Sequence, residues 1–154
     1  MVNIVLVYPR IPGNVGTIGR SCFAIDGTLH LVKPYGFGQI TKKEVRRAGL
    51  DYWESLKLFE YENIEQFWEA HRPDNRHFFA TTKSTQNYFD ISFKKGDYIY
   101  FGAEDSGLPD DILKKYSKNC ITVPMANGAR SLNLSNTVSI ISYEIVRQLY
   151  SGKL

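Results

Sequence analysis

The chain has 154 residues, 43% of them hydrophobic and 23% charged, and a formal net charge of +3 at pH 7. This length suits one domain around one core, and so small a charge does not by itself identify a nucleic-acid-binding protein. No apolar run is long enough to span a membrane and residues 1–8 do not resemble a secretory signal, so we expect a single domain, residues 1–154, in the cytoplasm.

Strand and helix patterns alternate along the chain. Residues 3–8 form a nearly continuous apolar run, typical of a strand buried on both faces of a parallel sheet. Asn14 is the expected N-cap of a helix that runs from Val15 to Asp26. Further strands are expected at residues 28–32, 56–61, 77–82, 97–101 and 120–123, and further helices from Thr41, at 64–71, at 109–116 and from 134 to 149. This alternation predicts an α/β fold with a mostly parallel six-stranded sheet and helices on both faces.

Several familiar sites are absent from the pattern. Cys22 and Cys120 lack metal-ligand spacing and sit in apolar runs, so we expect two buried free thiols and no metal. The glycines at 13, 16 and 19 match neither the dinucleotide fingerprint nor a P-loop. No G-x-S-x-G elbow accompanies the three histidines, for which we expect structural or surface positions rather than catalytic roles.

The helix expected from Thr41 concentrates positive charge. It contains Lys42, Lys43, Arg46 and Arg47, which form two like-charge pairs at a spacing of four residues. Either the helix is an ordinary solvated surface, or phosphate groups neutralise the patch. The sequence leaves both interpretations open.

Three loops gather functional side chains. Residues 9–20, 102–109 and 124–135 each follow an expected strand, and the carboxyl ends of parallel strands meet at one edge of a sheet. Their polar side chains are Asn14 and Arg20 in the first loop, Glu104 in the second, and Arg130, Ser131, Asn133 and Ser135 in the third. We therefore predict one shared site. Thr81 and Thr82, at the end of another strand, lie at the same edge.

The last helix has two stripes at helical spacing. Leu134, Val138, Ile141, Ile145 and Leu149 form an apolar stripe that predicts a core-facing side. The second stripe consists of Asn136, Ser139, Tyr143, Arg147 and Tyr150. Its polar and aromatic side chains indicate that this stripe contacts something other than the core.

The combination of three motifs resembles the SPOUT family of RNA methyltransferases. The motifs are N-x-G-x-I-x-R at residues 14–20, F-G-A-E-x-x-G-L-P at 101–109, and V-P-M followed by R-S-L-N-L-S-N at 123–136. Residues 29–52 and 143–149 are similar to the TrmL branch, so the resemblance covers the whole chain. It implies a deep C-terminal trefoil knot and a homodimer that methylates the ribose 2′-hydroxyl of the tRNA wobble nucleotide, a cytidine or modified uridine at position 34.

The resemblance also implies residue roles. S-adenosylmethionine would be held by Thr81, Thr82, Gly102, Glu104, Val123, Met125, Ser131, Leu132 and Asn133. Arg20, Tyr143, Glu104, Ser131 and Asn133 would form the catalytic set, and Arg20, Lys42, Lys43, Arg46, Arg47, Arg130 and Arg147 would contact RNA. The first and last helices would build the dimer interface, with Arg20 near the partner's cofactor.

Arg20 is better suited to positioning than to proton abstraction. A guanidinium stays protonated at neutral pH, whereas holding a phosphate and stabilising a developing alkoxide need no pKa change. Arg10 and Thr122 depart from the branch pattern, which leaves the choice of tRNA open. A 2′-O-methyltransferase of ribosomal RNA or of another tRNA position, and a non-catalytic RNA-binding module of this fold, stay as alternatives.

Overall fold

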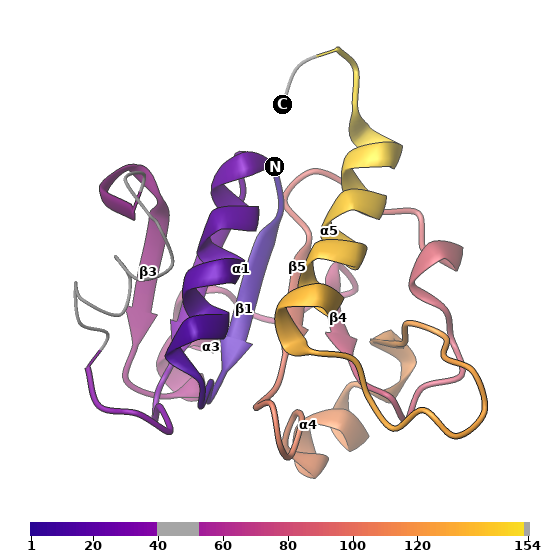
Figure 1. Ribbon diagram of the computed structural model, residues 1–154, viewed down its shortest axis with the longest axis horizontal. Coiled ribbons are helices and arrows are strands. Elements are labelled where there is room, and N and C mark those ends of the chain that lie inside the picture. The colour runs from indigo at the N-terminus through magenta and orange to yellow at the C-terminus, as the bar shows by residue number, and fades with distance from the viewer. Residues whose placement is uncertain (40–52, 153–154) are drawn as a thin grey trace.

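A single parallel sheet organises the molecule, for which a computed structural model describes residues 1–39 and 53–152 (Figure 1). Its six strands are β1 (Asn3–Val7), β2 (Thr28–Val32), β3 (Lys57–Tyr61), β4 (His77–Ala80), β5 (Tyr98–Phe101) and β6 (Cys120–Ile121). They are arranged in the order β3-β2-β1-β5-β4-β6, and every neighbouring pair is parallel. The predicted fold class is confirmed, and the sheet is wholly rather than mostly parallel.

Most predicted helices are present with shifted ends. They are α1 (Pro12–Ala24), α3 (Ile64–Ala70), α4 (Asp110–Lys115) and α5 (Leu134–Leu149), and short 3-10 turns occur at Trp53–Ser55, Tyr88–Asp90 and Ser117–Asn119. Asn63 caps α3 as expected, since its side chain accepts a hydrogen bond from the Gln66 amide. The predicted cap at Asn14 is wrong, because proline is well suited to a first helical position and α1 begins at Pro12. The helix expected from Thr41 lies outside the described residues.

The strands are buried on both faces because side chains alternate along them. In β1, Ile4 and Leu6 belong to one apolar cluster and Val5 and Val7 to another, and all four are fully buried. The first cluster includes buried residues of α1 and α5, and the second includes buried residues of α3 and α4. The helices therefore cover both faces, and α1 and α5 lie side by side on one of them (Figure 1).

The histidines belong to the packed interior of the face covered by α3. His30 and His77 are buried, and their ring nitrogens lie 3.2 and 2.7 Å from the hydroxyls of Tyr61 and Tyr100. Burial lowers the pKa of His30 to about 3 and that of His77 to about 4. His30 and His77 are thus packed in the interior rather than on the surface, and the predicted burial of the two free cysteines is confirmed.

Sheet topology brings the first and second predicted loops together. The chain crosses from β1 outward to β2 and β3, and it returns to the other side of β1 through β4 and β5. β1 and β5 are therefore neighbours at a point where the strand order reverses, which is where open α/β sheets bind ligands. Across the described ranges 1–39 and 53–152, no helix is long and apolar enough to cross a membrane.

Candidate functional site

A cavity of about 430 Å³ opens at the carboxyl ends of β4, β5 and β6. It is lined by Thr81, Thr82, Gly102, Glu104, Val123, Met125, Ser131 and Leu132, which are eight of the nine residues predicted to hold the cofactor. Other residues that line it, and that the sequence prediction did not assign to a cofactor site, include Phe101, Leu108, Leu134 and Thr137. The three segments that follow β4, β5 and β6 thus form one concave site.

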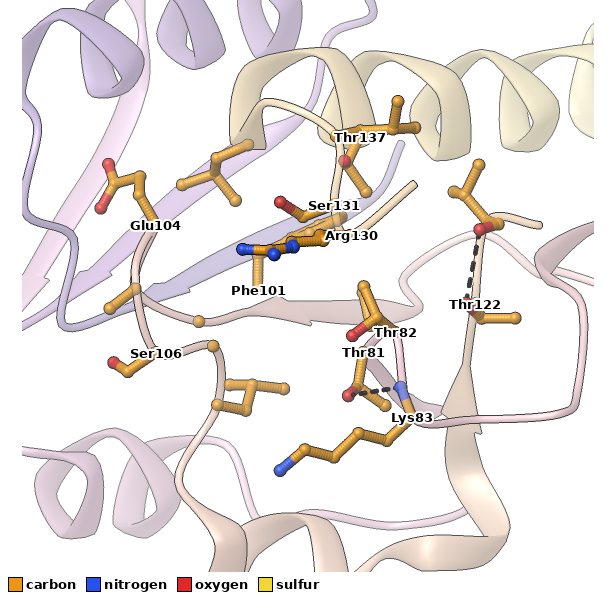
Figure 2. Close-up of a pocket in the computed structure, with 18 of the residues that line it drawn as sticks. Thr81, Thr82, Lys83, Phe101, Glu104, Ser106, Thr122, Arg130, Ser131 and Thr137 are labelled. Atoms are coloured by element: carbon orange, nitrogen blue, oxygen red, sulfur yellow. Dashed lines mark hydrogen bonds between the residues drawn. The ribbon is translucent and has the colours of Figure 1, made fainter. Parts of the chain in front are cut away.

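The cavity has an apolar wall and a polar rim. Figure 2 shows Arg130 and Ser131 above the end of β5 at Phe101, with Thr81 and Thr82 on the neighbouring strand end. Arg130 is exposed and makes no hydrogen bond or ion pair with the part of the chain that the structure describes. Lys83, also at the rim, donates to Asp110 at 2.8 Å and lowers the pKa of that carboxyl. Arg130 is therefore free to bind an anionic group, whereas Lys83 is already paired.

Glu104 ties the loop after β5 to the start of α1. Its carboxylate accepts hydrogen bonds from the backbone amides of Arg10 at 2.7 Å and Ile11 at 3.1 Å. The side-chain amide of Asn14 donates to the same carboxylate at 3.2 Å. A helix N-terminus stabilises a negative charge, so the first and second predicted loops are joined by a favourable electrostatic contact.

Asn133 completes the connection to the third loop. Its Nδ2 donates to Asn14 Oδ1 at 3.2 Å, and its Oδ1 accepts from the amides of Ser135 and Asn136, which makes Asn133 the N-cap of α5. Asn133 is not among the residues that line the cavity, and its contact with the cofactor stays a prediction. Its short side chain is committed to the helix cap and to Asn14. No local sequence pattern predicts this contact across 119 residues.

Gly102 is required by the protein's own backbone. A Cβ built on it would lie 1.9 Å from the carbonyl carbon of Gly107 and 2.0 Å from the amide nitrogen of Leu108. A side chain at position 102 would therefore clash with the protein's own backbone. The turn between β5 and α4 folds back onto Gly102 and shapes the cavity wall.

Arg20 and Tyr143 lie away from the cavity. Arg20 is eight residues beyond the start of α1 and Tyr143 nine beyond the start of α5, which places them about 12 and 13 Å along their helices from the sheet edge. α1 and α5 are in contact near these two residues, since the hydroxyls of Ser21 and Ser139 are 3.0 Å apart. Both side chains are exposed, and neither lines the cavity of its own chain.

The other predicted RNA contacts divide into two groups. Arg147 is exposed and makes two hydrogen bonds of 2.8 Å to Glu144, whose pKa this contact lowers to about 2. Lys42, Lys43, Arg46 and Arg47 lie outside the described residues, so their role stays a prediction. Within residues 1–39 and 53–152, no group of three or more His, Cys, Asp or Glu side chains could hold a metal ion.

The parallel sheet, the reversal of strand order and the cavity at its carboxyl edge define an α/β protein that binds its ligand between strand-end loops. A family model described as the SpoU rRNA Methylase family matches residues 1–143. The chain belongs to this family, which confirms the resemblance seen in the sequence.

Similar proteins agree with this membership. The tRNA (cytidine(34)-2'-O)-methyltransferase of Escherichia coli (strain K12) is 44% identical over 154 residues, which cover 99% of this chain and 97% of that protein. A solved structure described as giving insights into the 2-OH methylation of C/U34 on tRNA is 36% identical, with a TM-score of 0.90 and coverage of 97% and 96%. The SpoU methyltransferase AviRb from Streptomyces viridochromogenes, solved in complex with AdoMet, is 25% identical with a TM-score of 0.81. The alignment covers 98% of this chain and 58% of AviRb.

Proposed function

We propose that this protein transfers a methyl group from S-adenosylmethionine to the ribose 2′-hydroxyl of the wobble nucleotide, position 34, of a tRNA. The observation that carries the proposal is the convergence of the second and third motif loops on one cavity, with the first loop joined to both through Asn14. Near full-length similarity to a tRNA (cytidine(34)-2'-O)-methyltransferase supports it. We place this activity in the cytoplasm, where the protein would meet tRNA, and in the single domain that the sequence predicts.

The cavity suits S-adenosylmethionine in size and chemistry. Its volume of about 430 Å³ lies in the range of small-molecule sites. Val123, Met125 and Leu132 offer apolar surface for the adenine, and the threonines at the end of β4 offer hydroxyls. When bound, the cofactor supplies a methyl group on a sulfonium. The knot implied by the family resemblance stays a prediction.

The chain's own contribution is to position the acceptor hydroxyl. Methyl transfer is an in-line displacement, so alignment of the 2′-hydroxyl with the methyl group can supply much of the acceleration. Arg20 has no hydrogen-bond or ion-pair partner among the described residues, and its guanidinium is therefore available for the target phosphate and for the oxygen as it gains negative charge. Tyr143 offers a further hydroxyl contact.

These groups complete a site only if two chains combine. Arg20 lies about 12 Å along α1 from the start of that helix, and Tyr143 lies about 9 Å along α5 beyond Thr137, the last residue of α5 that lines the cavity. Arg20, Tyr143 and Ile140 are exposed and lie on the two adjacent helices α1 and α5, and a second copy docked on these helices would bring Arg20 and Tyr143 to the cavity of its partner. We therefore place the catalytic centre at a homodimer interface made by α1 and α5, with Arg20 acting across it.

A direct assay tests the activity. The protein is incubated with labelled S-adenosylmethionine and total tRNA, and the modified ribose is mapped. Label confined to position 34 is the expected result. Label at another tRNA position or in ribosomal RNA would show that the substrate differs from the one proposed. No incorporation into any RNA would favour the alternative of a non-catalytic RNA-binding module.

A further inference from the structure

A second hollow lies at the same edge of the sheet as the cofactor cavity. It has a volume of about 590 Å³ and is formed by the segment after β2 together with the end of β3. Its functional side chains are Lys33, Tyr35, Phe37, Gln39, Glu60 and Glu62. We call it the aromatic hollow, and neither the catalytic set nor the cofactor set predicted from the sequence includes any of its residues.

Two aromatic rings are held in fixed orientation there. The rings of Tyr35 and Phe37 are stacked with centroids 5.2 Å apart and planes 16° apart. Both are half-buried against the core, so part of each ring stays accessible. The Tyr35 hydroxyl donates to Glu60 at 2.5 Å, which fixes the ring further. A base can stack on such a platform without first ordering it.

The charged groups around the rings are two carboxylates and one ammonium group, so acceptors outnumber cations. Lys33 donates to one oxygen of Glu62 at 2.7 Å, and Tyr35 occupies one oxygen of Glu60. Among the described residues, the second oxygen of each carboxylate has no hydrogen-bond partner. One lysine and two glutamates disfavour a phosphate. They favour a neutral base whose exocyclic amine can donate to a carboxylate.

The aromatic hollow is fixed to the predicted active site. The Gly36 amide donates to the Pro9 carbonyl at 2.9 Å, and a Cβ on Gly36 would lie 2.7–2.9 Å from Arg10. The amide of Arg10 in turn donates to Glu104 at the cofactor cavity. β2 and β5 both neighbour β1, so the nearest strand ends of the two sites are about 10 Å apart along the sheet edge, within reach of neighbouring nucleotides of one RNA.

We propose that the aromatic hollow binds the base of an anticodon-loop nucleotide adjacent to the methylated one and prefers a base with an exocyclic amine. The base stacks on the rings of Tyr35 and Phe37, and its amine donates to the free oxygen of Glu60 or Glu62. This inference rests on the proposed function, because it assumes a tRNA held at the neighbouring cavity.

The test uses anticodon stem-loops with a constant target nucleotide and each of the four bases at the adjacent positions. With the full chain, kcat/KM is expected to be about tenfold higher for adenine, cytosine or guanine than for uracil at one of these positions, as expected for a good polar base contact. Glu62→Gln should reduce this preference. Phe37→Leu should lower kcat/KM for every stem-loop about tenfold, because an aromatic stack is lost. Glu69→Gln, an exposed carboxylate on α3, is the matched control and should change neither.

Stem-loop affinity and thermal midpoint are measured beside activity. Glu62→Gln alters an exposed side chain, so it tests the proposal even if Phe37→Leu unfolds. Equal rates and affinities for all four bases in the wild type, unchanged by Glu62→Gln, would overturn the proposal while leaving the methyltransferase intact. Absence of methyl transfer to any stem-loop would instead refute the proposed function, and the affinities would then still show whether the hollow selects bases.

Discussion

Asn14 sits in a hydrogen-bond chain whose direction is fixed at both ends. The backbone amides at the start of α5 donate to Asn133, Asn133 donates to Asn14, and Asn14 donates to Glu104. Because a backbone amide can only donate and a carboxylate can only accept, each asparagine side chain has one favourable orientation. The chain locks the starts of α1 and α5 to the cavity wall.

Asn14→Asp should break this chain. The new carboxylate would face Glu104 in a site where Asn14 is only 9% exposed, and a donor would be lost. We expect the free energy of unfolding at pH 7 to fall by about 1–3 kcal/mol and methyl transfer to be strongly reduced. Urea unfolding measures the first effect. Thr17→Ala on the exposed side of α1 serves as the control, and a wild-type free energy of unfolding for Asn14→Asp would contradict the interpretation.

The role of Asn14 marks the limit of local sequence patterns. Asparagine is a common helix cap, so a cap near this point was a reasonable prediction. The side-chain partners of Asn14 are 90 and 119 residues away in the chain, and no local pattern reports them. Cavity residues on the motif loops were predictable, but the polar network that holds those loops together was not.

Helix α1 is closely packed at one glycine and open at another. A Cβ on Gly19 would lie 2.7 Å from the ring of Trp53 and 3.1 Å from Leu56, whereas a Cβ on Gly13 would meet nothing within 4 Å. Gly19 therefore permits close packing of α1 against Trp53 and Leu56. The same substitution type should therefore have opposite effects at the two positions.

Gly19→Val should lower the free energy of unfolding by about 1–3 kcal/mol, because Trp53 must move. Gly13→Ala should raise it by up to about 1 kcal/mol, because alanine favours the helix and has room there. Denaturant unfolding of both variants measures the difference. A Gly19→Val protein as stable as Gly13→Ala would show that α1 does not pack on Trp53 as described.

Elements were predicted well where side-chain periodicity is set by the core, and poorly at their ends. β6 was expected at residues 120–123 but ends at Ile121. Thr122 instead accepts a hydrogen bond from Tyr88 and donates its amide to the Gln86 carbonyl, so the pairing continues outside the regular sheet. The partner of Thr122 is the segment at Gln86 and Tyr88, where no strand was expected. Apolar periodicity does not predict this pairing.

At the scale of the whole molecule, buried histidines make stability depend on pH. Burial lowers the pKa of His30 to about 3 and of His77 to about 4, below the ordinary value of 6.5 that the unfolded chain keeps. Between pH 6.5 and these lower pKa values, the unfolded state binds more protons than the folded state. The contribution of the two histidines to the free energy of unfolding is therefore fully present above pH 6.5 and is lost as the pH decreases. By pH 4, each histidine should lower the free energy of unfolding by on the order of 1–3 kcal/mol.

Unfolding by urea between pH 7.5 and 4 measures this loss. His77→Gln keeps a polar side chain that does not titrate, and its stability should depend less on pH than that of the wild type. Lys57→Gln alters an exposed ion pair elsewhere and should keep the full dependence. A flat profile for the wild type would show that these histidines are not buried as neutral groups.

The proposed dimer makes a prediction that a single chain could not satisfy. Arg20→Ala removes the acceptor-positioning group but leaves the cavity, whereas Leu132→Asp places a charge in the apolar cavity wall but leaves Arg20. Each variant alone should transfer almost no methyl groups. If Arg20 acts across the interface, a mixed dimer joins the intact cavity of one chain to the intact Arg20 of the other. Equal mixing with free exchange should then restore about a quarter of wild-type activity.

The matched control mixes Arg20→Ala protein with the double variant Arg20→Ala/Leu132→Asp. That mixture contains no chain with an intact Arg20, so no activity should return, although subunits exchange as before. Chromatography and mass measurement establish that mixed dimers form, and labelled methyl transfer to tRNA gives the activity. If mixed dimers form and activity stays at the level of this control, Arg20 serves its own chain. Arg20 would then have to reach the cavity of its own chain from a position about 12 Å along α1 from the start of that helix.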